Sequence, residues 1–141
     1  MIWFEKQELD KINKLCDNTM VSFLNIKISK ITDSELYGSM PVSDKIKQPY
    51  GIVHGGANCV LAESLGSLAA NLTVDHKLFH AVGLNINTAH IKAVRNGTIH
   101  AVAKAEHIGR LTQVWRIETF NDNEQLTSTT NLTMAIISRL K

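Results

Sequence analysis

The hydrophobic pattern changes its period along the chain, and its longest helical stretch lies near the middle. From Gly55 onward, small and aliphatic residues recur at steps of three and four over about four turns, which is typical of a helix buried along one stripe. The predicted buried stripe consists of Ala57, Val60, Leu61, Ser64, Leu65, Leu68 and Leu72. A shorter repeat of Leu9, Ile12 and Leu15 within residues 6–17 predicts an amphipathic helix that braces one edge of the domain.

Most other segments alternate between hydrophobic and polar residues, as strands do. Residues 21–42 show this alternation on both sides of a Thr-Asp-Ser turn, which predicts a hairpin. Further strands are predicted at residues 81–94, 98–108, 111–121 and 125–139. Because the strands are grouped and do not alternate with helices, they predict an α+β domain, in which one antiparallel sheet packs a face against the long helix.

Length and composition narrow the possibilities. A chain of 141 residues, 44% of them hydrophobic, suffices for one domain with its own core, so residues 1–141 are predicted to be a single domain. The formal net charge of +2 is spread without a basic run, which argues against nucleic acid or a membrane surface as the main partner. The start has no signal-peptide pattern, and no run reaches about 18 apolar residues. Cys16 and Cys59 suggest reduced thiols, so we expect a cytoplasmic protein.

One carboxylate interrupts the long helical pattern. Glu63 lies off the predicted buried stripe. An ionised carboxylate at its position is costly if it is dry and unpaired. Its neighbours three, four and seven positions away are mostly small, so another backbone or a ligand could approach closely; they are Gly56, Cys59, Val60, Gly66, Ser67 and Ala70. From the residues alone, two interpretations stay open: a solvated surface glutamate or a functional carboxylate.

A set of motifs in a fixed order carries a family resemblance from Met1 to the last strand. The motifs are MIW, KQPYGIVHGG, VLAESLGS, VGLNINTAH and QVWRIE. The chain resembles the hotdog-fold acyl-CoA thioesterases of the 4-hydroxybenzoyl-CoA branch with a helix glutamate. Within that branch it is most similar to the bacterial 1,4-dihydroxy-2-naphthoyl-CoA hydrolases and the enterobactin-pathway proofreading thioesterases. The resemblance implies an antiparallel sheet wrapped around one long central helix, plus a short N-terminal helix.

The resemblance also implies catalytic roles for Glu63, Gln48, His54 and Gly55. Glu63 would be the nucleophile or the general base, and the sequence leaves both open. The Gln48 amide and the Gly55 backbone N–H, at the positive end of a helix, would polarise the thioester carbonyl. His54 would orient the substrate or contact the thioester sulphur. Because Glu63 follows His54 by nine positions, about 13 Å along a helix, we expect the two residues of one site to come from different subunits.

A second set of residues is implied to bind the acyl-CoA substrate. The coenzyme A arm and nucleotide are expected along Gly83, His90, Ile91, Lys92, Ala93, His107, Gly109 and Arg110, and the acyl group near Tyr50, Ser64 and Ser67. Lys92 replaces the arginine usual in the family, which keeps the charge but loses the bidentate fork. Ordinary structural interpretations also stay open: solvated charges, a loop contact for Tyr50, and serine hydroxyls bonded to their own helix.

The remaining expectations concern the substrate, the assembly and the alternatives. We expect an aromatic acyl-CoA, of the 1,4-dihydroxy-2-naphthoyl or hydroxybenzoyl type, because KQPYG and AESLGS resemble that branch and Tyr50 offers a flat wall. A homo-oligomer is implied, as a site-forming dimer or a dimer of dimers. No cofactor is expected beyond the coenzyme A of the substrate, and the six histidines lack metal-ligand spacing. The alternatives are a thioesterase of broad or aliphatic specificity, a hotdog dehydratase, and a non-catalytic acyl-CoA binding protein.

Overall fold

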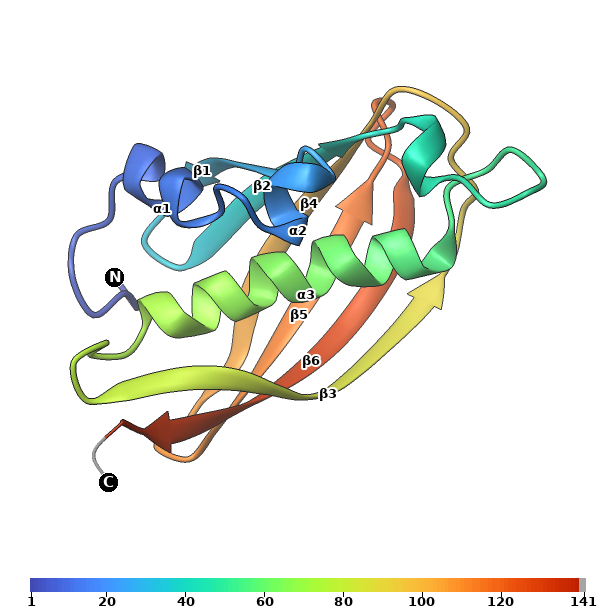
Figure 1. The fold of residues 1–141 in the computed structure, drawn as a ribbon. Helices are drawn as coiled ribbons and strands as arrows, with labels where there is room; N and C mark the ends of the chain where they lie inside the picture. The colour runs from blue at the N-terminus through green and yellow to red at the C-terminus, as the bar shows by residue number, and fades with distance from the viewer. Residues whose placement is uncertain (140–141) are drawn as a thin grey trace.

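A six-stranded antiparallel sheet wraps around a long helix in the computed structural model, which describes residues 1–139 (Figure 1). The strand order is β1-β2-β4-β5-β6-β3, so β1 and β3 form the two edges. The strands are β1 (Lys27–Ile31), β2 (Glu35–Pro41), β3 (Phe79–His90), β4 (Thr98–Ile108), β5 (Thr112–Phe120) and β6 (Leu126–Ser138). The predicted α+β class and hotdog arrangement are confirmed.

The long helix α3 (Gly55–Leu72) lies on the concave face of the sheet and begins where the sequence predicted. Leu61 and Leu65 are fully buried, as are Trp115 of β5 and Leu132 of β6, so one core joins helix and sheet. The predicted buried stripe was partly wrong. Three of its members, Val60, Ser64 and Leu68, are only partly buried, whereas Ala62, Gly66, Ala69 and Ala70 are buried. The curved sheet covers a wide arc of the helix, and small residues on that arc allow close approach.

The predicted small-residue face around Glu63 is accordingly only partly open. Gly66 packs against Ile117 and Leu132 of the sheet and belongs to the core. Gly56 is exposed and Cys59 is partly buried. The open part of the helix face therefore lies on the side of Gly56, Cys59 and Glu63.

The N-terminal region differs from the predicted hairpin at its start. Helix α1 (Leu9–Leu15) is shorter than predicted, but it does brace an edge strand: Asn13 Oδ1 accepts from the Ile28 N–H at 2.9 Å, and Asn13 Nδ2 donates to the Ile28 carbonyl at 2.9 Å. The prediction of a strand from residue 21 was wrong, because residues Met20–Phe23 form helix α2. Thr19 and Ser22 form a reciprocal capping box there, and this local hydrogen bonding outweighs the alternating pattern.

Strand β3 ends earlier than the predicted 81–94. After His90, the N–H groups of Ile91 and Lys92 both donate to the Thr127 carbonyl, which ends the regular ladder. The chain then runs beside the loop before α3, where the Val53 N–H donates to the Val94 carbonyl at 2.8 Å. Two distant sequence motifs, around residues 48–55 and 90–94, are thereby brought together.

Both cysteines, Cys16 and Cys59, are free thiols, as predicted. Within residues 1–139, the structure contains no helix that combines the length and the apolar character needed to cross a membrane.

Candidate active site

The N-terminus of α3 presents an unused backbone donor. His54 is the N-cap, with extended backbone (φ −63°, ψ 133°), and its Nδ1 accepts from the Gly56 N–H at 2.8 Å. The Gly55 N–H has no acceptor within residues 1–139. Since the helix dipole makes this end positive, the free N–H can bind an oxygen that gains negative charge. The cap was not predicted, and it leaves the exposed Nε2 of His54 as the protonated nitrogen.

Gln48 supplies a second donor next to this helix end. Its side-chain Oε1 accepts a short hydrogen bond from the Tyr50 N–H, which fixes the amide orientation. The Gln48 amide nitrogen has no acceptor in the described part of the chain. Gln48 and Gly55 line one cavity of about 240 Å³, and its other lining residues are Ile52, Val53, Asn58, His90, Ile91, Lys92, Ala93 and Val94. The two predicted carbonyl donors and the predicted substrate-binding segment from His90 to Ala93 therefore meet in one place.

Asn58 is a site residue that the sequence prediction missed. Its side chain is buried, and its Nδ2 lies 3.4 Å from His90 Nδ1. Its Oδ1 is buried with no hydrogen-bond partner among residues 1–139. A buried polar atom left in this way costs about 1–3 kcal/mol of folding free energy. An amide four residues after the cap, within an apolar helix pattern, was the available signal in the sequence.

Glu63 lies away from this cavity, against the edge strand β3. The carboxylate is exposed and has no ion pair or hydrogen bond to another described residue. A Cβ at Gly83 would lie 2.7 Å from Glu63 Oε1, so only glycine lets the carboxylate rest against the strand here. The register of β3 shifts between Gly83 and Asn85, and such bulges are frequent beside active sites.

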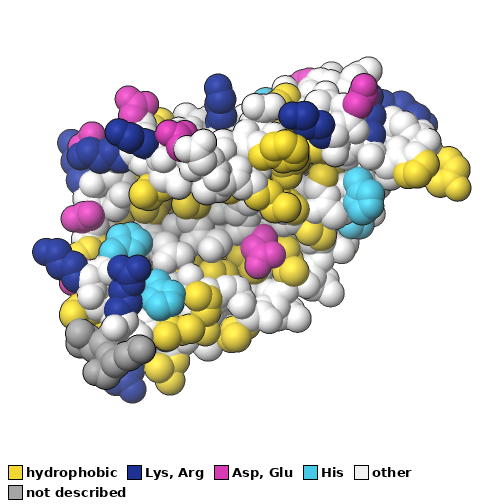
Figure 2. Space-filling model, viewed as in Figure 1, with side chains coloured by type: hydrophobic (Ala, Val, Ile, Leu, Met, Phe, Trp, Pro, Cys, Tyr) yellow, Lys and Arg dark blue, Asp and Glu magenta, His cyan; other side chains and the backbone are white. Residues whose placement is uncertain are grey.

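The surface over α3 and β3 is otherwise poor in charge. Figure 2 shows an acidic side chain there surrounded by hydrophobic and uncharged atoms. Glu63 is the single acidic residue of α3, and it does not line the cavity of Gln48 and Gly55. Within one subunit, the predicted carboxylate is therefore apart from the predicted carbonyl donors. This is expected if a complete site takes its carboxylate from one subunit and its donors from the other.

The other predicted residues are spread along the molecule. Ser64 and Ser67 lie beside Glu63 in α3 and are partly buried; neither hydroxyl bonds to a described helix carbonyl, so that alternative has no support here. His107, Gly109 and Arg110 lie around the β4–β5 turn, at the end of the sheet far from Gly55 (Figure 1). Tyr50 is 85% exposed and does not line the cavity, so one chain does not form the predicted aromatic wall.

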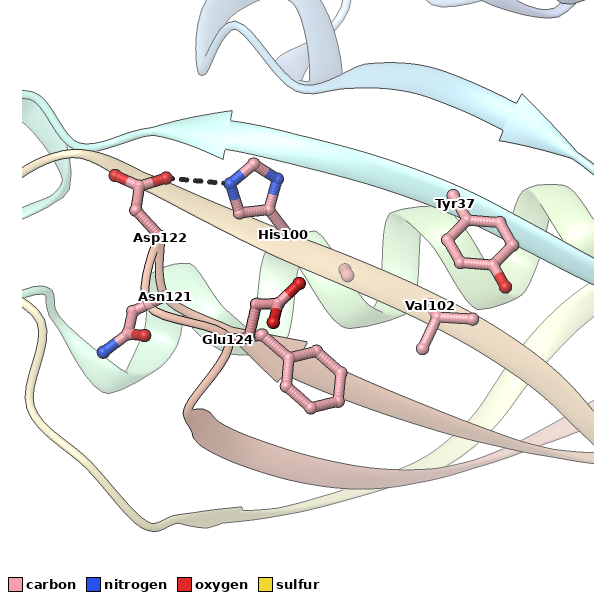
Figure 3. Close-up of a pocket in the computed structure, with 8 residues that line it drawn as sticks. Tyr37, His100, Val102, Asn121, Asp122 and Glu124 are labelled. Carbon is pink, nitrogen blue, oxygen red and sulfur yellow. Dashed lines mark hydrogen bonds and ion pairs between the residues drawn. The ribbon is translucent and has the colours of Figure 1, made fainter.

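A second cavity, of about 480 Å³, is on the sheet face turned away from α3, and none of the predicted site residues lines it (Figure 3). Two of its polar lining residues pair with each other: His100 Nε2 lies 2.9 Å from Asp122 Oδ1. The Thr98 N–H also donates to Asp122 Oδ2 at 3.0 Å. The hydrogen bond to His100, followed by that from Thr98, lowers the pKa of Asp122 below its ordinary value. In the described residues, no three His, Cys, Asp or Glu side chains are grouped to hold a metal ion.

Comparisons with known proteins agree with this fold and site. Residues 50–128 match the family described as "Thioesterase superfamily". The 1,4-dihydroxy-2-naphthoyl-CoA hydrolase of Escherichia coli K12 is 42% identical over 137 residues, which cover 97% of this chain and 100% of that protein. A thioesterase structure from Haemophilus influenzae superimposes with a TM-score of 0.96 at 37% identity, over 100% of this chain and 98% of the other.

A second solved structure, of a thioesterase variant from Pseudomonas aeruginosa, has a TM-score of 0.96 at 38% identity and covers 98% of this chain and 99% of its own. The sheet wrapped around a long helix is shared with both of these thioesterase structures. The chain belongs to the thioesterase superfamily. The predicted family and the predicted enzyme class, an acyl-CoA thioesterase, are confirmed.

Proposed function

We propose that this protein hydrolyses aromatic acyl-CoA thioesters to the free acid and coenzyme A, at a site shared between two subunits. The observation that carries the proposal is the pair of unused donors, Gln48 and Gly55, on one cavity, with an unpaired carboxylate, Glu63, on the adjacent open edge. Thioester hydrolysis needs both a polarised carbonyl and a group that delivers or activates a nucleophile.

The two donors would act on the thioester oxygen. As a nucleophile adds to the carbonyl carbon, negative charge collects on that oxygen, and the Gln48 amide and Gly55 N–H stabilise it. Collapse of the adduct breaks the carbon–sulphur bond, and the electron pair leaves with the coenzyme A sulphur. The exposed Nε2–H of His54, the residue directly before Gly55, is a further donor, which would orient the substrate or contact the sulphur.

Glu63 would supply the nucleophile in one of two ways. Its carboxylate either attacks the carbonyl to form a mixed anhydride that water then opens, or it removes a proton from an attacking water molecule. A single turnover in heavy-oxygen water separates the routes. The anhydride route can leave the label in Glu63, whereas the general-base route places it in the acid product alone.

The shared site follows from the open edge of β3. This strand pairs with β6 on one side, and no described residue pairs with its other side. Leu84, at the bulge, is 61% exposed. Pairing of β3 with its copy across a two-fold axis would cover this long edge and bring the helices of two subunits side by side. Glu63 of one subunit would then face the Gln48 and Gly55 cavity of the other, in a dimer or a dimer of dimers.

The substrate assignment is supported by the relatives. The Escherichia coli protein named 1,4-dihydroxy-2-naphthoyl-CoA hydrolase aligns over almost the whole chain, so that thioester is our first choice and hydroxybenzoyl-CoA the second. In this proposal Ser64 and Ser67, which lie near Glu63, line the binding site of the acyl group. Tyr50 is an exposed loop residue and would reach the acyl group only in the assembled dimer. We also propose that the protein is a single-domain cytoplasmic enzyme. It would need no cofactor, because coenzyme A is part of the substrate.

The coenzyme A arm is proposed to follow the segment from His90 to Ala93, with Lys92 and Arg110 as candidates for contacts to its phosphates. Lys92 and Arg110 are exposed and in no ion pair with a described residue, so their charges are free for an anionic ligand. Because Arg110 lies at the other end of the sheet, it would serve the site of a neighbouring subunit.

The test is a thiol-release assay with a panel of coenzyme A thioesters. We expect the highest kcat/KM for the hydroxynaphthoyl ester, a lower value for the hydroxybenzoyl ester, and the lowest for a medium-chain aliphatic ester. A preference for the aliphatic ester would overturn the aromatic assignment and leave the thioesterase class intact. Absence of thiol release with every ester would refute the proposed activity.

A further inference from the structure

Asn58 is a buried amide near the start of α3 that the reaction described above does not use. Its side chain is 7% exposed, and its Oδ1 is buried without a hydrogen-bond partner. It lines the same cavity as Gln48 and Gly55. A polar side chain that destabilises the fold at such a position calls for a functional explanation.

The contacts of Asn58 lead to His90. Asn58 Nδ2 lies 3.4 Å from His90 Nδ1, on one side of the imidazole ring. On the other side, His90 Nε2 would lie 2.8 Å from a Cβ at Gly55, so the ring rests directly against the glycine. The ring is held between Asn58 and the residue whose N–H is the free carbonyl donor.

We propose that Asn58 is a positioning residue that holds His90 in its neutral Nε2–H form, with Nε2 turned towards the Gly55 donor. An amide N–H that donates to Nδ1 requires a lone pair there, which places the ring proton on Nε2. His90 then adds a third donor to Gln48 and Gly55 at the thioester oxygen.

This inference rests on the proposed thioester hydrolysis, because only a reaction that develops negative charge on oxygen gains from a further donor. An Nε2 lone pair would repel that charge, whereas an Nε2–H would stabilise it. The competing arrangement has the Asn58 amide reversed, so that Oδ1 accepts from Nδ1–H and Nε2 is left as an acceptor. With the amide reversed, His90 could contact the coenzyme A arm but could not donate to the thioester oxygen.

The first test is Asn58→Leu, which keeps the number and branching of the side-chain heavy atoms and removes the amide. Because the unsatisfied polar atom is lost, we expect an unchanged or higher melting temperature. Loss of the ring position should lower kcat roughly 10- to 100-fold with KM nearly constant. A lower melting temperature with unchanged kcat would show a purely structural amide, and a rise in KM alone would place His90 on the coenzyme A arm; either result overturns the proposal.

Asn71→Leu is the matched control on the same helix. Asn71 makes hydrogen bonds to the Ala81 N–H at 2.9 Å, the Ala81 carbonyl at 3.0 Å and the Ser67 carbonyl at 2.9 Å. Its loss should lower the melting temperature while the His90 ring stays in place. The two variants therefore separate destabilisation of α3 from displacement of His90.

The second test reads the tautomer directly by nitrogen-15 NMR of the labelled protein, with the His90 signals assigned by their loss in His90→Ala. We expect Nε2 protonated and Nδ1 bare in the wild type, and the reverse in Asn58→Asp, whose carboxylate accepts from Nδ1–H. A wild-type Nδ1–H would overturn the proposal even if the enzyme is active. If the wild type cleaves no thioester, the proposed function fails, while a bare Nδ1 would still support the Asn58–His90 pairing.

Discussion

Two polar regions of the molecule differ in whether their hydrogen-bonding groups are already used. In the cavity on the outer sheet face, His100 and Asp122 pair with each other (Figure 3), and the Thr98 N–H also donates to Asp122. At the start of α3, the Gly55 N–H and the Gln48 amide nitrogen have no acceptor within residues 1–139. The outer region is the larger one, at about 480 Å³ against about 240 Å³.

This difference shows that cavity volume is the poorer guide to function here. A catalytic group must form interactions that strengthen in the transition state, and a group already engaged with a neighbour has little left to offer. Free donors at a helix N-terminus, and a carboxylate farther along the same helix with no partner among the described residues, meet this condition. In the outer cavity, the Asp122 carboxylate already pairs with His100 and accepts from the Thr98 N–H.

The largest expected effect is at Glu63. Glu63→Gln nearly preserves the shape and removes the nucleophile or base, so kcat should fall by several orders of magnitude with an unchanged circular dichroism spectrum. Glu63→Asp should also be poorly active, because it withdraws the carboxylate. If Glu63→Gln kept more than about a tenth of the wild-type rate, the proposed role of Glu63 would be wrong.

Gln48→Ala should have the next largest effect, since it removes one of the donors to the thioester oxygen. We expect kcat to fall about 10²–10³-fold, measured by thiol release. Gln7→Ala is the control, because Gln7 bonds only to the nearby Glu5 carbonyl and lies outside the cavity. Equal activity of both variants would remove Gln48 from the site.

Gly83→Ala tests the contact between the edge strand and the carboxylate. The added methyl group would lie 2.7 Å from Glu63 Oε1 and must displace it. Misplacement of a reacting group by about 1 Å can cost about 10²-fold in rate, so we expect a loss of that order with the fold retained. Wild-type kinetics would mean that the carboxylate works from another position.

The smallest effect on activity is expected in the outer cavity, at Asp122→Asn. Its hydrogen bonds lower the pKa of Asp122 in the folded state, so its contribution to stability is present above the unfolded pKa and is lost as pH falls through the folded pKa. The variant should therefore show a flatter loss of stability in that acidic range, with kcat/KM at neutral pH unchanged. A large loss of activity would contradict the contrast between the two regions.

The sequence predicted those parts of the molecule that depend on local periodicity. The start of α3 at Gly55 and the grouped strands followed from hydrophobic spacing and turn residues. Helix α2 was missed because the Thr19–Ser22 capping box spans an apparent alternation. The buried side of α3 was partly misjudged, because the width of the covered arc depends on the curvature of the whole sheet.

The residues of the candidate site could be proposed from the sequence, but their geometry could not. Gln48, Gly55 and Glu63 were identified by the family motifs. Their separation along the predicted helix alone suggested that they do not meet within one subunit. The contact of Glu63 with Gly83, the His54 cap and the buried Asn58 amide required the register of β3 and the path of residues 90–94. The spacing of residues in the sequence specifies neither the register of β3 nor the path of residues 90–94, since both arise from pairing between distant segments.

The central claim, a site completed by two subunits, is tested most directly by mixing inactive variants. Glu63→Ala and Gln48→Ala subunits, unfolded together and refolded, should form mixed dimers with one intact site. Random pairing predicts about a quarter of the wild-type activity. A mixture of Gln48→Ala with His54→Ala, both on the cavity side, should recover nothing. No recovery in the first mixture, with mixed dimers verified by affinity tags, would contradict the shared site.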